Sequence, residues 1–196
     1  HIPQGARGSP AHEMLEGLRF IKANTLFAFL IGMTFFNSFF GMAYQVMMPE
    51  FAQKILGLGA GAYGSLLSAS GAGALITTFW LGSRKDVQNR GRLIIGGATM
   101  FGLSVAAFAL TSEFVGSYYL AMALMFTTGI FNSAYMISIQ SSLQLMVPDH
   151  MRGRVMGFYG MTWSIMPLSG MQAGALASFI GTAFAVMAGG LAVAAF

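Results

Sequence analysis

A short charged segment, residues 80–92, interrupts a long apolar part of the sequence. It contains four of the ten Lys and Arg residues, namely Arg84, Lys85, Arg90 and Arg92. The flanking runs, Ala60–Gly82 and Leu93–Leu110, carry no charge. Each is about 20 residues long, which is enough to cross a bilayer as a helix. A cationic turn between two membrane spans also sets their direction, because Lys and Arg are retained on the cytoplasmic side.

Composition supports a membrane protein and excludes several other classes. The chain is 56% hydrophobic and 8% charged, whereas an average soluble domain is roughly 25% charged. It has no cysteine, and no His/carboxylate cluster has the spacing of a metal site, so we expect no metal and no cofactor. The net charge of +4 lies in short turns rather than along one helical face. We therefore expect lipid, and not nucleic acid, as the partner of this charge.

The apolar runs predict six transmembrane helices in an all-α bundle formed by residues 25–196. The expected spans are Thr25–Met48, Ala60–Gly82, Leu93–Leu110, Ser117–Leu145, Val155–Phe179 and a last one from Thr182. Pro49 is expected to end the first span, and Pro167 to kink the fifth. The last run reaches Phe196 after about 15 residues, which is short of the ~30 Å hydrocarbon core. We therefore expect the sequence to stop inside a helix of a longer protein.

The distribution of cations predicts the orientation of these spans. In the six-span arrangement nine of the ten Lys and Arg residues fall on one side, and only Lys54 falls on the other. This asymmetry indicates a cytoplasmic N-terminus and a cytoplasmic position for the turns at Arg84–Arg92 and Arg152–Arg154.

Residues 1–24 are expected to be a cytoplasmic lead that contains one amphipathic helix. Ser9-Pro10 is a favourable helix start, and Met14, Leu15, Leu18 and Ile21 then form one apolar stripe. This pattern is typical of an interfacial helix on the membrane surface. A helix packed on another protein domain fits the same pattern.

A weak internal repeat divides the spans into two triples. Arg90-Gly91-Arg92 precedes the third span and Arg152-Gly153-Arg154 precedes the fifth. The first, second and fourth spans carry the polar residues, whereas the third and sixth carry almost none. This division fits the 3+3 inverted repeats of secondary transporters.

Several motifs resemble those of the major facilitator superfamily. Gly82-x-x-x-Asp86 followed by Arg90-Gly91-Arg92 resembles the loop signature between the second and third helices of each six-helix half. The Arg-Gly-Arg element is displaced by about two residues from its usual place, the looser form expected of a second half. The resemblance extends to the drug and siderophore exporter branch through two further segments, Gly64–Ala74 and Pro148–Gly157. Glu16–Ile21 resembles the end of the family's central cytoplasmic connection.

This resemblance implies the C-terminal six-helix half of a twelve-helix transporter. The function expected from it is alternating-access export of a small organic, amphipathic solute across a bacterial cytoplasmic (inner) membrane. The expected partners are membrane lipid, the small-molecule substrate, and an N-terminal six-helix half or another membrane subunit. An alternative is a non-transporting, transporter-like structural subunit of a larger membrane protein complex. A partner chain of unrelated fold would favour that alternative.

No residue pattern supports an enzyme. All carboxylates, histidines and cations fall outside the expected spans, and no His is available to activate a Ser. What remains in the spans is uncharged and polar. One helical stripe on the first span comprises Thr34, Asn37, Ser38, Gly41 and Gln45, and a similar stripe on the fourth comprises Thr128, Asn132, Tyr135 and Ser142.

Two interpretations of these stripes are open. In the resembled family the first and fourth helices of each half line the central cavity, which implies that the stripes contact substrate. Alternatively, they hydrogen-bond to neighbouring helices, as polar side chains in lipid often do. Trp163 joins the candidate substrate residues from one face of the fifth span, which it shares with Tyr159, Thr162 and Met166.

The cationic turns have two interpretations as well. In the family, contacts between the loop Asp and nearby arginines hold one conformation, which implies a gating role for Asp86 with Arg90, Arg92, Arg152 or Arg154. The alternative is charge that only sets topology. Finally, the i, i+4 pairs Gly153/Gly157 and Gly170/Gly174 predict surfaces where helices pack closely or slide.

Overall fold

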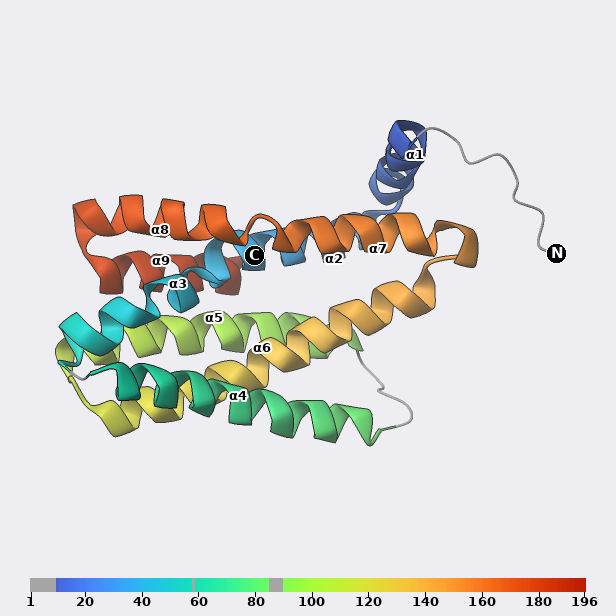
Figure 1. The fold of residues 1–196 in the computed structure, drawn as a ribbon. Coiled ribbons are helices and arrows are strands. Elements are labelled where there is room, and N and C mark those ends of the chain that lie inside the picture. Colours follow the sequence, from blue (N-terminus) through green and yellow to red (C-terminus); the bar gives the residue numbers. More distant parts are fainter. Residues whose placement is uncertain (1–9, 58, 85–89) are drawn as a thin grey trace.

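The structure is a computed structural model that describes residues 10–57, 59–84 and 90–196. These residues form a helical bundle (Figure 1). In chain order the elements are α1 (Pro10–Ala23), α2 (Thr25–Phe36), the π-helix η1 (Asn37–Gly41), α3 (Ala43–Glu50), the π-helix η2 (Phe51–Ile55), α4 (Ala60–Gly82), α5 (Arg90–Phe114), α6 (Tyr118–Met146), α7 (Asp149–Trp163), α8 (Met166–Ile180) and α9 (Thr182–Ala195).

Four helical runs in the described part of the chain are long and apolar enough to cross a membrane. They are Thr25–Ile55, Gly61–Gly82, Arg90–Phe114 and Tyr118–Met146. The surface of the bundle also carries large apolar side chains: Phe79 is 75% exposed and Phe179 is 86% exposed. Large aromatic side chains at such positions are stable against lipid and unfavourable against water. The chain is therefore an integral membrane protein.

The helices form two layers that α5 joins (Figure 1). Helices α4, α5 and α6 lie in one layer, while α2, α3, α7, α8 and α9 lie in the other. Helix α5 packs extensively on both α6 and α9. Helix α1, the C-terminal end of α4, the N-terminal end of α5 and the α6–α7 turn all lie at one end of the bundle (Figure 1). That end carries Arg84, Arg90, Arg92, Arg152 and Arg154, whereas Lys54 lies at the other.

Helix α1 forms as predicted and packs on the bundle of its own chain. The Glu16 Oε2 atom forms an ion pair with Arg154 Nη1 of α7 at 2.8 Å. A Cβ atom at Gly17 would lie 3.1 Å from the Arg154 Cβ atom, and Ile21 is buried among residues of α2, α6 and α7. Met14 and Leu15 remain exposed. One edge of α1 is thus held by protein, and its other apolar residues remain available to the membrane surface.

The expected end of the first span at Pro49 is wrong. Pro49 lies inside α3, and the helical run continues to Ile55. A proline removes only its own N–H donor, and contacts beyond it hold the chain helical. Phe51 is fully buried with its ring 5.0 Å from that of Phe108 on α5, and Lys54 pairs with Glu50 at 3.0 Å.

The expected kink at Pro167 is confirmed. Helix α7 ends at Trp163, and α8 begins at Met166 with Pro167 in its first turn. Because Pro167 has no N–H, it cannot donate to the Trp163 carbonyl four residues earlier. The fifth expected span therefore consists of two 15-residue helices that follow one another across the bundle (Figure 1).

Glycines bring helix backbones together at three crossings. At one of them, a Cβ atom at Gly189 of α9 would lie 2.6 Å from the Phe40 carbonyl oxygen of η1. A Cβ atom at Gly73 of α4 would collide with the Phe126 carbonyl of α6, and one at Gly129 of α6 would collide with the Ser70 carbonyl of α4. Helices α5 and α9 meet in the same way at Gly102 and Gly190. Such crossings allow Cα–H···O contacts and close van der Waals packing, which drive helix association in lipid.

The two glycine pairs that sequence spacing predicted as packing surfaces contribute less to helix packing within this chain. Cβ atoms at Gly153 and Gly157 would meet no described atom within 4 Å, so the prediction of close packing there is wrong for this bundle. Gly170 does approach α3, since its Cβ atom would lie 2.7 Å from Val46 Cγ1, and Gly174 makes an ordinary contact with Met47.

We expect Gly73→Ala to lower the melting temperature of the purified protein by several degrees. The added methyl meets backbone that cannot move aside, and overpacking of this kind costs about 1–3 kcal/mol. Gly71→Ala, on the same helix, is the matched control, because a Cβ atom there meets nothing within 4 Å. Equal melting temperatures for the two variants would contradict the assigned α4–α6 crossing.

Candidate functional site

Two interrupted helices lie against each other in the upper layer of the bundle. The first interruption is η1, between α2 and α3, and the second is the break between α7 and α8. Both η1 and α3 contact α8. Interrupted helices expose backbone groups and re-aim side chains, and transporters build solute sites from them.

The π-helix has a local cause in the residues that form it. The Met42 N–H group donates to the Asn37 carbonyl at 2.9 Å, which is an i→i+5 bond. Gly41 makes room for this turn, because a Cβ atom there would lie 2.5 Å from Asn37 Oδ1 and 2.9 Å from the Phe101 ring. The extra residue changes which way the following side chains point. Gln45 accordingly leaves the buried stripe, and its Nε2 atom donates to Tyr44 Oη at 3.1 Å.

The structure separates the other residues of the first stripe by their hydrogen bonds. Thr34 is fully buried, and its hydroxyl donates to the Leu30 carbonyl at 2.9 Å. Asn37 and Ser38 are also fully buried. Neither polar atom of the Asn37 amide, nor the Ser38 hydroxyl, has a hydrogen-bond partner among the described residues. An unpaired buried polar group costs about 1–3 kcal/mol, so these two side chains are exceptional for a folded interior.

The second stripe, on α6, divides in the same way. The buried Thr128 hydroxyl donates to the Leu124 carbonyl at 2.8 Å. Asn132 Oδ1 and Tyr135 Oη lack partners within the described part of the chain. Tyr135 lies in the same buried cluster as Met33, about one helical turn before Asn37. Helix α6 contacts α2, the helix that leads directly into η1 with its unpaired Asn37 and Ser38.

Two further residues belong with this set and were not predicted. Ser169 is fully buried on α8, and neither its hydroxyl nor Gln172 Oε1 has a partner in the described residues. Their i, i+3 spacing in an apolar span was the available sequence signal. Only the tertiary contact of α8 with η1 connects them to Asn37 and Ser38.

The residues predicted to share one face of the fifth span differ in their exposure. Tyr159 and Thr162 are buried, and the Thr162 hydroxyl donates to the Tyr159 carbonyl at 2.6 Å. Trp163 is exposed and lies at the break between α7 and α8. Contact between Trp163 and a substrate stays a prediction.

The predicted gating residues are distributed over several partners. Asp86 lies outside the described residues. Arg152 pairs with Asp149 at 2.7 Å, one helical turn away. Arg154 pairs instead with Glu16 of α1. Arg90 and Arg92 lie in the first turn of α5, at the same end of the bundle (Figure 1). The contact of Asp86 with any of these arginines stays a prediction.

Taken as a site, the unpaired groups are amides and hydroxyls in an apolar, helical, membrane-embedded interior. Such groups donate and accept hydrogen bonds without bringing charge, so the site suits a neutral or weakly polar solute, as expected of a membrane transporter with interrupted helices. A family model described as the Major Facilitator Superfamily matches residues 30–196. The chain belongs to this family, whose members are membrane transporters and not enzymes. No curated protein and no solved structure matches the chain.

We expect Asn37→Leu to leave the melting temperature unchanged or to raise it. Leu has nearly the shape of Asn and removes an amide that has no partner, so the desolvation cost of about 1–3 kcal/mol disappears. Thr34→Val is the control, because it removes a hydroxyl that is already bonded. A clearly lower melting temperature for Asn37→Leu than for Thr34→Val would show that the Asn37 amide stabilises helix packing through a hydrogen bond.

Proposed function

We propose that the chain is a six-helix half of a major-facilitator transporter, arranged as a 3+3 inverted repeat. The four long runs supply the first four spans. Helices α7 and α8 together form one interrupted fifth span, and α9 forms the sixth. The order of the cytoplasmic motifs supports assignment to the C-terminal half. An N-terminal six-helix half, or another membrane subunit, is then the partner that completes the cavity.

The proposed activity is alternating-access export of a small organic, amphipathic solute. The observation that carries this proposal is the set of unpaired polar groups in η1 and on α6: Asn37, Ser38, Asn132 and Tyr135. A solute that supplies hydrogen bonds to these groups removes their desolvation cost, and its apolar part suits the surrounding Met and Phe side chains. We assign Thr34, Gln45 and Thr128 to positioning, because their groups are bonded locally. Trp163 is assigned to the rim.

Movement between the two states of such a transporter requires helices that bend. Helix α8, which follows the α7–α8 break, packs on η1, so neighbouring spans offer two bending points. The cytoplasmic turn is proposed to hold one state through Asp86 and the arginines at positions 90, 92, 152 and 154. The proposed location is a bacterial cytoplasmic membrane, with the N-terminus inside.

Cysteine labelling tests the orientation. The chain has no native cysteine, so single cysteines can be introduced at Ser83 and Val115, which are both exposed. We expect an impermeant maleimide to label Val115→Cys in intact cells and Ser83→Cys only after permeabilisation. Thr128→Cys, at a fully buried position, is the unlabelled control. Labelling of Ser83→Cys from outside would reverse the topology.

Dye efflux tests the transport proposal. Cells that express the complete natural protein should accumulate less ethidium or Nile red than cells with an empty vector. Tyr135→Phe should raise the dye concentration that gives half-maximal efflux roughly 5- to 150-fold, which corresponds to a loss of about 1–3 kcal/mol of binding free energy. Its melting temperature should be unchanged or higher, because the hydroxyl has no partner among the described residues.

Tyr119, on the same helix, is 83% exposed. Tyr119→Phe is therefore the matched control, and its efflux should be unchanged. Normal efflux in Tyr135→Phe would remove this hydroxyl from the site. Equal accumulation of both dyes with and without the protein would contradict export of this solute class.

A further inference from the structure

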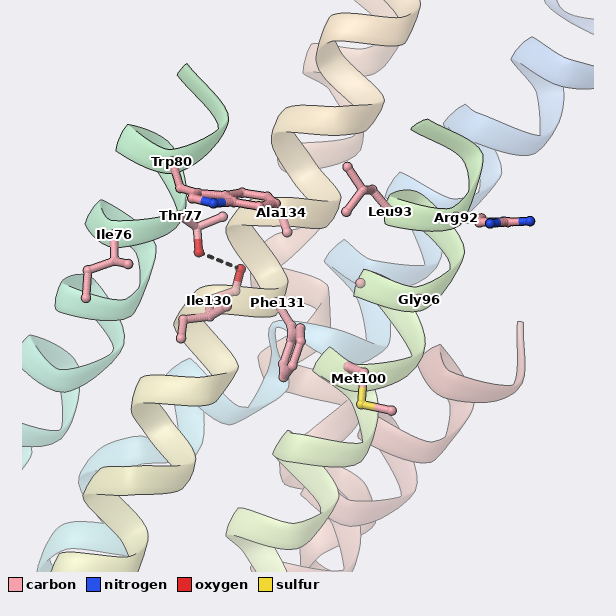
Figure 2. Close-up of a pocket in the computed structure, with 11 residues that line it drawn as sticks. Ile76, Thr77, Trp80, Arg92, Leu93, Gly96, Met100, Ile130, Phe131 and Ala134 are labelled. Carbon is pink, nitrogen blue, oxygen red and sulfur yellow. Dashed lines mark hydrogen bonds between the residues drawn. The ribbon is translucent and has the colours of Figure 1, made fainter. Parts of the chain in front are cut away.

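A groove of about 410 Å³ lies on the other layer of the bundle, away from the interrupted helices. Helices α4 and α5 form its walls and α6 forms its floor (Figure 2). The groove exists because α4 and α5 both pack extensively on α6 but scarcely on each other. Gly96 keeps it open on the α5 side, since a Cβ atom there meets no described atom within 4 Å.

The lining of the groove is apolar along most of its length. Phe131 and Met100 lie toward one end, and Trp80 and Leu93 lie toward the other (Figure 2). Thr77 contributes a hydroxyl, but it donates to the Ile130 carbonyl at 3.2 Å. The groove opens onto apolar surface, because Ile76 is 55% exposed and Ile95 is 58% exposed. Such a surface suits a hydrocarbon chain and not a polar solute.

The Trp80 end of the groove is cationic. Arg92 lines this end and extends outward from α5 (Figure 2). The Arg84 guanidinium lies over the Trp80 ring, 4.1 Å from its centroid. A neighbouring hollow of about 340 Å³ is lined by Arg84, Arg90 and the hydroxyl-bearing Ser138 and Ser141. No described carboxylate lines the groove or this hollow, and none pairs with these three arginines.

We propose that this groove binds an anionic glycerophospholipid of the surrounding leaflet. One acyl chain lies in the groove between α4 and α5. The phosphate lies at the arginine end, where guanidinium groups donate paired hydrogen bonds to phosphate oxygens. The N-terminal end of α5 adds positive partial charge at the same place. Basic pockets between transmembrane helices are known to bind anionic headgroups.

A lipid explains both parts of the site, and a free phosphate explains only one. The apolar groove and the arginines are continuous through Trp80 and Arg92, and only a molecule with a charged head and a hydrocarbon tail fills both. Its occupancy would bridge α4 and α5 where the protein itself provides little contact. The proposal is independent of the solute that the protein carries.

The test uses the complete purified protein in a neutral detergent. Dioleoyl-phosphatidylglycerol should raise the melting temperature and be retained in native mass spectra, whereas dioleoyl-phosphatidylcholine and inorganic phosphate should do neither. Each cation near the membrane surface contributes about 1 kcal/mol of attraction to anionic lipid, or about fivefold in affinity. Arg84→Gln combined with Arg92→Gln should therefore weaken phosphatidylglycerol binding about 25-fold. Arg19→Gln with Lys22→Gln, both exposed on α1, is the control of equal charge.

A second variant separates a groove from general attraction to positive charge. Gly96→Leu keeps all the arginines and fills open space, so the protein should fold normally and lose phosphatidylglycerol retention. Unchanged binding in Gly96→Leu would overturn the acyl groove, and unchanged binding in the double arginine variant would overturn the headgroup site. An equal rise in melting temperature with inorganic phosphate would identify an anion site in place of a lipid site.

Discussion

The fold depends on direct contact between helix backbones. In lipid there is little hydrophobic gain from bringing two apolar helices together, so close packing has to supply the attraction. Here it does so where Gly73 and Gly129 join α4 to α6, and where Gly102 and Gly190 join α5 to α9. Helix α5 therefore has one partner in each layer, and the two layers are held at a short distance through it. The other spans contain the two interruptions, η1 and the α7–α8 break.

These interruptions are located where unpaired polar side chains occur. The π-helix η1 and the α7–α8 break interrupt two neighbouring spans, and unpaired amide and hydroxyl groups lie in or beside them. A bundle made only of continuous helices with satisfied side chains would be more stable and less able to exchange partners. The same residues thus weaken the interior and provide its capacity for recognition. Of the glycine crossings, those of α4 with α6 and of α5 with α9 lie outside the interruptions, whereas Gly189 of α9 meets the backbone of η1 itself.

The sequence predicted those features that depend on local chemistry. Runs without charge located the long helices, and the missing N–H of Pro167 located a real break. The prediction that the first span ends at Pro49 was wrong, because the tertiary contact of Phe51 with Phe108 holds the helix together beyond it. The glycine crossings were missed because spacing along one helix does not say which helix lies opposite, and Gly153 and Gly157 have ideal spacing with nothing beside them.

For the site, the polar stripes were visible in the sequence. The division into bonded residues such as Thr34 and unpaired ones such as Asn37 required the neighbours.

The attachment of α1 to α7 has a mechanical consequence. Arg154 and Glu16 tie the two helices together near the middle of α1, and Gly17 lets them touch there. Helix α1 is about 20 Å long at 1.5 Å per residue, so a small tilt of α7 is enlarged at the free end of α1. Because α7 leads directly into the break before α8, a change of angle at that break would also move α1.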